Sequence, residues 1–296
     1  MIDATINTSN ILFMNSVSRY VVNFDPFAVR FPDGFFLEGI RWYGLSYLAG
    51  FVAALLLFNL YTRRGKSPLT NDDNSTLVTY LLFGVIVGGR LGYMLFYALD
   101  SFLQNPLLFF QVWKGGMASH GGFIGVVVAV WLFSVVHKKS FAAIADLVVA
   151  SASAGIFFGR IANFVNGELW GKISDAPWAM IFPNSAPDGT PLEAIAARHP
   201  SQLYEAATEG LFLFLYSQFR LWKCDLPKGQ LAGEYLVLYG ILRIFCEVFR
   251  EPDAGVEFIC GLQRGSFYSI FAILVGVVFI VAARAMNRRN STAGKK

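Results

Sequence analysis

The chain contains long apolar runs, and a helix needs about 20 such residues to cross the hydrocarbon of a bilayer. Runs 42–62, 115–136 and 265–283 contain no Asp, Glu, Lys or Arg, and four other runs contain one to three ionisable residues each. This pattern predicts an all-α integral membrane protein with about seven transmembrane helices. The expected helices cover residues 41–62, 75–98, 117–136, 141–162, 202–221, 231–250 and 265–284.

Lysine and arginine are distributed unevenly between the two sets of connecting segments. Thirteen lie in segments at one end of the predicted helices, and seven lie at the other end. Because short cytoplasmic segments carry the excess of basic residues, the richer end is expected in the cytoplasm. With seven helices, this places the C-terminus in the cytoplasm and the N-terminus outside.

The segments outside the apolar runs suggest how the chain is organised. Residues 1–40 are expected to form an extracytoplasmic N-terminal arm, and residues 285–296 a basic cytoplasmic tail. Between them, residues 41–284 would form the seven-helix transmembrane domain. Segment 163–201 contains five prolines and polar turn residues, so it predicts a folded extracytoplasmic head inserted into that domain.

The composition supports a membrane protein and excludes several other classes. Hydrophobic residues make up 55% of the chain and charged residues 15%, against about 45–50% and 25% in soluble domains. A net charge of +4, spread over short loops, argues against a nucleic-acid partner. Cys224, Cys246 and Cys260 have no metal-ligand spacing, and no metal or nucleotide motif occurs, so we expect no cofactor and no metal.

Ionisable residues within an apolar run indicate function, since burying them is costly unless they are paired or wetted. Tyr239, Arg243, Glu247 and Arg250 follow i, i+4, i+8, i+11 spacing and therefore share one helical face. One interpretation is an ion-pair ladder that only joins helices. The other is an anion site, because two arginines for one glutamate leave one positive charge unmatched.

A second polar set ends the run at 141–162, within the sequence GRIANFVNGELWG (159–171). It contains Arg160, Asn163, Asn166, Glu168 and Gly171, and its Asn-Gly pair predicts a turn. Polar loops at membrane depth are tolerated where they line a cavity. Because the arginine fork donates two parallel hydrogen bonds, two arginines on different helices suggest a phospholipid headgroup site. The alternative is a helix end with satisfied caps.

The third candidate is His120, in KGGMASHGG (114–122) at the start of an apolar run. A neutral histidine is a natural general base near pH 7. The four glycines around it permit close backbone approach, which fits a structural role as well.

Six stretches of the chain together resemble the bacterial phosphatidylglycerol–prolipoprotein diacylglyceryl transferase family. They are RWYGLSYLAGF (41–51), GVIVGGRLGYMLFY (84–97), VWKGGMASHGGFIG (112–125), GRIANFVNGELWG (159–171), RHPSQLYEA (198–206) and YGILRIFCEVFREPD (239–253). They occur in the family's order and cover nearly all the predicted helices. Two positions depart from the family pattern: Ala162 replaces a usual glycine, and GSFYS (265–269) replaces Gly-Gln-x-Leu-Ser.

The resemblance implies an enzyme of the bacterial cytoplasmic (inner) membrane. It would transfer the sn-1,2-diacylglyceryl group of phosphatidylglycerol to the lipobox cysteine of prolipoprotein signal peptides, releasing glycerol 1-phosphate. The resemblance also implies that Arg160 and Arg243 are essential. It gives supporting roles to His120, Tyr43, Asn163, Glu168, Gly171, Tyr239 and Glu247.

The chemistry of this reaction fits the residues. A thiolate is the nucleophile and needs a base, for which His120 is the candidate. Arg160 and Arg243 would neutralise the departing phosphate, and Glu247 with Arg250 would hold Arg243. A transporter of phospholipids or anionic solutes remains the alternative, since it would also use buried arginines. An intramembrane protease is a third class, but no Gly-x-Ser-x-Gly motif is present.

Overall fold

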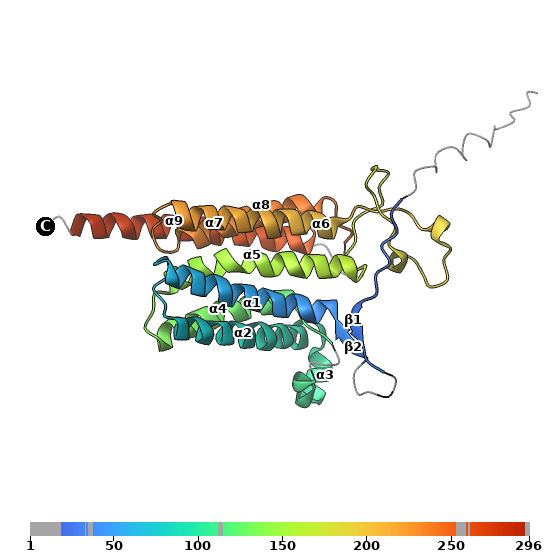
Figure 1. Cartoon of the computed structure of the whole chain (residues 1–296), viewed down its shortest axis with the longest axis horizontal. Coiled ribbons are helices and arrows are strands. Elements are labelled where there is room, and N and C mark those ends of the chain that lie inside the picture. The colour runs from blue at the N-terminus through green and yellow to red at the C-terminus, as the bar shows by residue number, and fades with distance from the viewer. Residues whose placement is uncertain are drawn as a thin grey trace, which may run out of the picture.

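The computed structural model describes residues 19–32, 34, 38–111, 115–252, 259 and 261–293, and most of them are helical (Figure 1). The long helices are α1 (Trp42–Arg63), α2 (Asn71–Tyr97), α4 (Ser119–Val136), α5 (Phe141–Val165), α7 (Leu213–Lys223), α8 (Gln230–Glu247) and α9 (Arg264–Ala293). Shorter elements are β1 (Phe27–Arg30), β2 (Gly39–Arg41), α3 (Leu99–Gln104), α6 (Ser201–Glu205), the π-helix η7 (Ala206–Phe212) and the 3-10 helices η3 (Pro106–Phe110), η5 (Pro183–Ser185) and η6 (Leu192–Ala194).

Helices occur at the places that the apolar pattern predicts, with α6, η7 and α7 following one another over the fifth range. Among the described residues, four helices are long and apolar enough to cross a membrane: α1, α2, α5 and α9. α4 is apolar but shorter, while α8 carries three charged residues and the fifth range is divided between three elements. The chain is therefore an α-helical membrane protein, and the number of seven spans remains a prediction.

Local sequence explains where several helices begin. Thr70 and Asp73 form a capping box at the start of α2, and Ser140 accepts a hydrogen bond from the backbone of α5. At the start of α8, the Asp146 carboxylate of α5 accepts hydrogen bonds from Gly229 N and Ala232 N, both at 2.7 Å. A carboxylate at a helix N-terminus satisfies free N–H groups, so Asp146 is explained by the fold.

The helices lie roughly parallel to one long axis, with α5 between two groups (Figure 1). α1, α2 and α4 lie on one side of it, and α6 to α9 on the other. Glycines allow α2 and α4 to approach closely. A Cβ at Gly121 of α4 would overlap Gly88 O of α2, and one at Gly125 would overlap Gly84 O. These glycines thus let α2 and α4 pack backbone to backbone.

Burial is uneven along the bundle. A buried apolar cluster lies where the Arg63 end of α1 packs against α2, α4 and α5. It includes Phe58, Tyr61, Leu77 and Phe133. Large apolar side chains elsewhere are exposed on the helix surfaces, among them Leu56, Phe83, Trp131, Phe219 and Val278. Exposed apolar surface of this extent on long helices fits contact with lipid.

The segment after α5 and the described part of the N-terminal region lie at the end of the bundle opposite the C-terminus (Figure 1). Val22 N donates to Ile181 O at 2.9 Å, which joins the two. The antiparallel pair β1–β2 leads into α1. Beside β1, the Arg30 guanidinium holds the pKa of the exposed Asp25 carboxyl below its usual value.

Parts of the predicted arm and tail lie outside the described residues, namely 1–18, 33, 35–37 and 294–296. The same applies to Cys260, to residues 112–114, which begin one family-like stretch, and to residues 253–258, the first of which ends another. The boundaries of arm, transmembrane domain, head and tail therefore stay predictions.

Candidate active site

Two buried glutamates bring Arg160 of α5 and Arg243 of α8 together. Glu205 lies 2.9 Å from Arg160 Nε and 2.6 Å from Arg243 Nη1 through its two oxygens. Glu209 also reaches both arginines, each at 3.5 Å. The two guanidinium groups are therefore neighbours, as a shared headgroup site requires.

The other two charged residues of the α8 face complete this cluster. Glu247 pairs with Arg243 Nη2 one turn away, and Arg250 Nη1 lies 3.4 Å from Glu205 Oε1. The expectation of one unmatched positive charge was wrong. Glutamates on α6 and η7 supply the missing negative charges, so these ion pairs join three arginines to three glutamates. Counting the charged residues of α8 alone omits the charged partners that other helices provide.

Within this ion cluster, the glutamate and arginine side chains differ in how far they are exposed. The side chains of Glu205 and Glu209 are 0% exposed, while those of Arg160 and Arg243 are 19% and 11% exposed. The glutamates therefore lie behind the arginines, whose accessible parts can contact an incoming anion. Since an arginine presents five N–H groups, it can bind carboxylates on one side and phosphate oxygens on another.

The π-helix η7 places Glu209 in this position. Gly210 packs against α5, where a Cβ would meet Phe157 Cα at 2.8 Å. Single π-helical turns within α-helices often occur at functional sites. Here the wide turn lies between α6 and α7, directly after Glu205 and across Glu209.

The beginning of α9 closes the cluster on another side. A methyl group at Gly265 would overlap Glu247 Oε1 and lie 3.2 Å from Arg243 Nη2. Gly265 therefore leaves room for the Arg243–Glu247 pair in its present position. This gives part of the divergent stretch 265–269 a structural role that the sequence left unassigned.

The turn after α5 forms a second polar group. Asn163 Nδ2 and Asn166 Nδ2 donate to Glu168 Oε1 at 2.7 and 3.4 Å. Gly167 has a φ of +60°, which favours glycine in this turn. The Asn-Gly turn predicted from the sequence is thus confirmed, and its amides fix the carboxylate of Glu168.

Gly171 lies where the segment after α5 contacts both the α6 entry and the end of α8. Its N–H donates to His199 O at 2.9 Å. A Cβ at Gly171 would lie 2.6 Å from both His199 O and Phe249 O. No larger residue fits without moving these strands of backbone, one of which leads directly to Arg250. Gly171 therefore lets these segments of backbone pack closely.

The three remaining candidates contact aromatic neighbours. Tyr43 OH lies 3.3 Å from Tyr47 OH. Tyr239 stacks on Tyr235 with ring centroids 6.2 Å apart. The half-buried His120 ring packs against Tyr268 of α9 at 4.4 Å. The described contacts thus join Arg160, Arg243, Glu247 and Arg250 in one cluster, while His120, Tyr43 and Tyr239 lie outside its ion pairs.

Arg90, Arg220 and Glu234 are further ionisable residues within the helices, and each has a structural partner. Arg90 is 3% exposed and donates to the carbonyls of Leu108, Phe109, Gln111, Gly115 and Gly116. It thereby holds the segment that leads to His120. Arg220 and Glu234 form a pair at 2.6 Å towards the other end of α8. Within the described residues, no group of three or more His, Cys, Asp and Glu could hold a metal ion.

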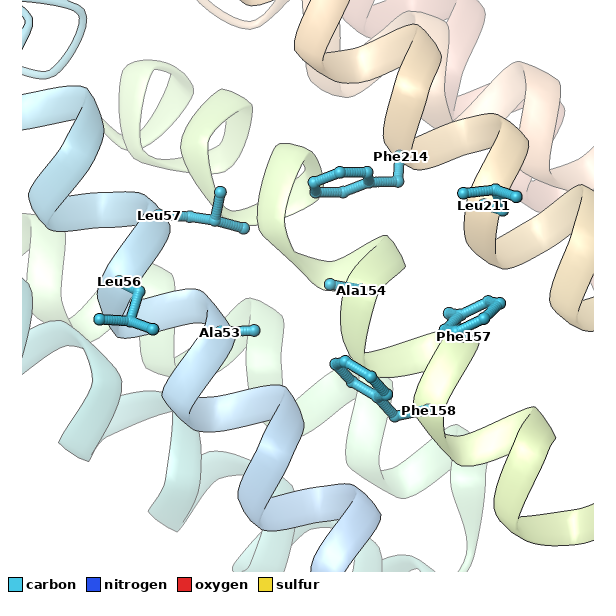
Figure 2. Close-up of a pocket in the computed structure, with 8 residues that line it drawn as sticks. All are labelled: Ala53, Leu56, Leu57, Ala154, Phe157, Phe158, Leu211 and Phe214. Atoms are coloured by element: carbon cyan, nitrogen blue, oxygen red, sulfur yellow. The ribbon is translucent and has the colours of Figure 1, made fainter. Parts of the chain in front are cut away.

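An apolar pocket of about 390 Å³ lies between α1, α5 and the η7–α7 segment (Figure 2). Its lining contains no polar residue: Ala53, Leu56, Leu57, Ala154, Phe157, Phe158, Leu211 and Phe214. Phe158 precedes Arg160 by two positions, and Leu211 follows Glu209 by two. The pocket therefore extends from the level of the ion cluster towards the middle of α1 and α5.

The sequence interpretation did not recognise Glu205 and Glu209 as site residues. The available signal was two glutamates four residues apart at the beginning of an otherwise apolar run. Such residues need partners when they are buried. The arginines of the two neighbouring motifs were the available candidates.

Comparison with known proteins connects this geometry to one family. The family model described as "Prolipoprotein diacylglyceryl transferase" matches residues 34–282. A protein of Solidesulfovibrio magneticus named phosphatidylglycerol–prolipoprotein diacylglyceryl transferase is 45% identical over 276 residues, covering 90% of this chain and 97% of its own length. Proteins of the same name from Rhodospirillum centenum and Photorhabdus laumondii are 45% and 41% identical, each over 82% of this chain and 87% and 88% of their own. The chain belongs to the prolipoprotein diacylglyceryl transferase family.

Proposed function

We propose that Arg160 and Arg243 bind the phosphate of phosphatidylglycerol while the enzyme transfers the diacylglyceryl group to the lipobox cysteine of a prolipoprotein. Diacylglyceryl transfer to prolipoproteins is the activity of the family to which the chain belongs. The observation that carries the headgroup assignment is the bridging of both arginines by Glu205 and Glu209. It sets two partly accessible guanidinium groups side by side, the arrangement that suits a phosphate with several oxygens.

In the proposed reaction the cysteine thiolate attacks the glycerol carbon that is bonded to the phosphate oxygen. A C–S bond forms, the C–O bond breaks, and the electron pair of that bond stays on the phosphate of glycerol 1-phosphate. Arg160 and Arg243 stabilise this charge as it develops, which accelerates the step because the interaction strengthens in the transition state. His120 is the proposed acceptor of the thiol proton. No metal or cofactor is needed for this displacement.

The remaining candidates would position these groups. Tyr43, Asn163, Asn166, Glu168 and Tyr239 are proposed to contact the substrate or the turn that holds it. Glu247 and Arg250 are proposed to fix Arg243 and Glu205. Gly171 keeps the backbone of the turn close to the end of α8.

Mass spectrometry tests this function directly. A lipobox peptide mixed with phosphatidylglycerol and the purified enzyme should gain the mass of one diacylglyceryl group. A peptide with serine in place of the lipobox cysteine should stay unmodified. Unmodified cysteine peptide would contradict the transferase assignment and leave transport as the function, while peptide cleavage would indicate a protease.

We infer seven transmembrane spans in the bacterial inner membrane, with the N-terminal arm 1–40 and the head 163–201 outside and the tail 285–296 in the cytoplasm. Reporter fusions after Arg64 and Lys139 should therefore report the cytoplasm, and a fusion at Gly189 the outer side. The physical basis is the excess of basic residues at the Arg64 end. A cytoplasmic signal at Gly189 would contradict the seven-span arrangement.

We also infer that one acyl chain of the lipid lies in the apolar pocket of Figure 2. The pocket begins at the level of Arg160 and Glu209, since its lining residues Phe158 and Leu211 lie two positions from them, and it contains no polar lining residue. A lipid with its phosphate at the arginines could therefore extend a chain into it. Ala154→Leu should fill the pocket and raise the KM for long-chain phosphatidylglycerol about tenfold, since overpacking typically costs about 1–3 kcal/mol. Dioctanoyl phosphatidylglycerol should be affected less.

Ala152 provides a matched control, because it lies on α5 two residues away and is exposed. Ala152→Leu adds the same atoms outside the pocket and should leave both KM values unchanged. Equal effects of Ala154→Leu on long and short chains would contradict the acyl-chain assignment.

A further inference from the structure

Binding of an anionic headgroup would disturb the charge balance of the ion cluster. The described ion pairs join Arg160, Arg243 and Arg250 to three glutamates. A phosphodiester brings one further negative charge. Within these ion pairs, three positive charges would then face four negative ones in a region of low dielectric constant. Because an uncompensated buried charge is costly, an ionisable group in such a place tends to become neutral instead.

The contacts identify Glu209 as the carboxylate that is held least strongly. Glu205 contacts all three arginines at 2.6, 2.9 and 3.4 Å. Glu247 forms a close pair with Arg243. Among the described residues, Glu209 has two ion pairs, both at 3.5 Å, although its side chain is 0% exposed. It also lies four residues after Glu205, a spacing at which like charges repel on a helix.

The groups packed around Glu209 limit where a proton could go. Arg160 of α5 and Arg243 of α8 remain protonated, since the guanidinium group does not lose its proton in proteins. Glu205 is stabilised by three arginines, and Tyr235, Tyr239 and Cys246 of α8 are neutral acids at pH 7 that already carry their protons. Of the carboxylates in direct contact with both arginines, Glu209 is the one whose protonation costs the least.

We propose that Glu209 takes up one proton from solution when the lipid phosphodiester binds beside Arg160 and Arg243. This inference rests on the proposed headgroup site. The proton restores the balance of three positive and three negative charges among these ion pairs and the phosphate. Glu209 acts through the arginines and does not touch the lipid, so it is a positioning residue whose protonation is coupled to substrate binding.

Equilibrium binding without peptide tests this coupling, because no transfer can occur without a thiol. Calorimetry of short-chain phosphatidylglycerol, in two buffers that differ in ionisation enthalpy, should give about one proton taken up per lipid by the wild-type enzyme at pH 8. The Kd should rise with pH, by up to about tenfold per pH unit, as one linked proton requires. Glu209→Gln imitates the protonated state, so it should bind more tightly at pH 8 and show no proton uptake.

Glu234→Gln is the matched control, since Glu234 is a partly buried partner of Arg220 outside the site. It should keep the proton uptake and the pH dependence of the wild type. His120 is a further ionisable group near the arginines, and Glu209→Gln retains it, so the difference between the wild-type and variant profiles belongs to Glu209.

The outcomes separate this inference from the proposed function. No proton uptake by the wild type would overturn the inference, and that measurement needs no variant that folds. Tighter binding by Glu209→Gln with unchanged proton uptake would also overturn it, because the proton would then be bound elsewhere. Unchanged lipid binding in Arg160→Gln would instead show that the headgroup site is wrong. Weaker binding in Arg160→Gln without uptake in the wild type would overturn only the role of Glu209.

Discussion

Replacing Arg243 by lysine is expected to lower the rate of diacylglyceryl transfer by about 10²–10³, the typical loss when one transition-state donor is removed. Arg243 uses Nη1 for Glu205 and Glu209 and Nη2 for Glu247. A lysine keeps the positive charge but has a single ammonium group, so it cannot maintain these contacts and also donate two parallel hydrogen bonds to phosphate. The rate of peptide modification at saturating phosphatidylglycerol measures the effect, and Arg160→Lys should behave similarly.

Arg220 offers a control for the general effect of replacing an ion-paired arginine by lysine. Its Nε and Nη2 atoms bind Glu234 at 2.7 and 2.6 Å, towards the opposite end of α8 from Arg243. Arg220→Lys should therefore retain the transfer rate while changing thermal stability. If lysine at 160 and 243 supported nearly normal rates, general charge balance would suffice and the headgroup role would be wrong.

The positions of the helices could be predicted from the sequence because the bilayer fixes their length and polarity. The apolar runs located every long helix to within a few residues, except that α9 continues past the expected end at residue 284 to Ala293. Regular hydrogen bonding within each helix makes this a local property. The π-helix at Ala206–Phe212 could not be predicted in this way. Its wide turn depends on how Gly210 packs against Phe157 of α5, which is a contact between distant parts of the chain.

The candidate site was predictable only for residues within recognisable motifs. Arg160 and Arg243 were found because each interrupts or ends an apolar run, and the structure brings both to Glu205. The balance of charge was not predictable, since it depends on which helices are neighbours. The contact of Gly265 with the cluster was also missed, because it depends on the side chain of Glu247 on another helix.

His120→Asn is expected to lose most activity at pH 7 and to recover about tenfold or more by pH 9. A thiol with a pKa near 8.5 is only a few per cent ionised at pH 7, so a base is needed there, whereas at pH 9 solvent hydroxide supplies the thiolate. Asparagine retains a polar side chain of similar size but cannot accept the proton. The transfer rates of variant and wild type should be compared over this range with phosphatidylglycerol saturating, so that lipid binding does not enter the profile.

His137 is a suitable control because it lies at the other end of α4. It stacks on Phe133 at 4.4 Å, the same centroid distance as between His120 and Tyr268. His137→Asn should therefore leave the pH profile unchanged even if it alters helix packing.

The competing explanation is that His120 only organises the cavity through its contact with α9, next to the glycine-rich segment before α4 that Arg90 holds. That explanation requires His120→Asn to lose lipid binding and to stay inactive at pH 9, because added thiolate cannot restore a displaced helix. Recovery at high pH with normal lipid binding would assign the proton to His120.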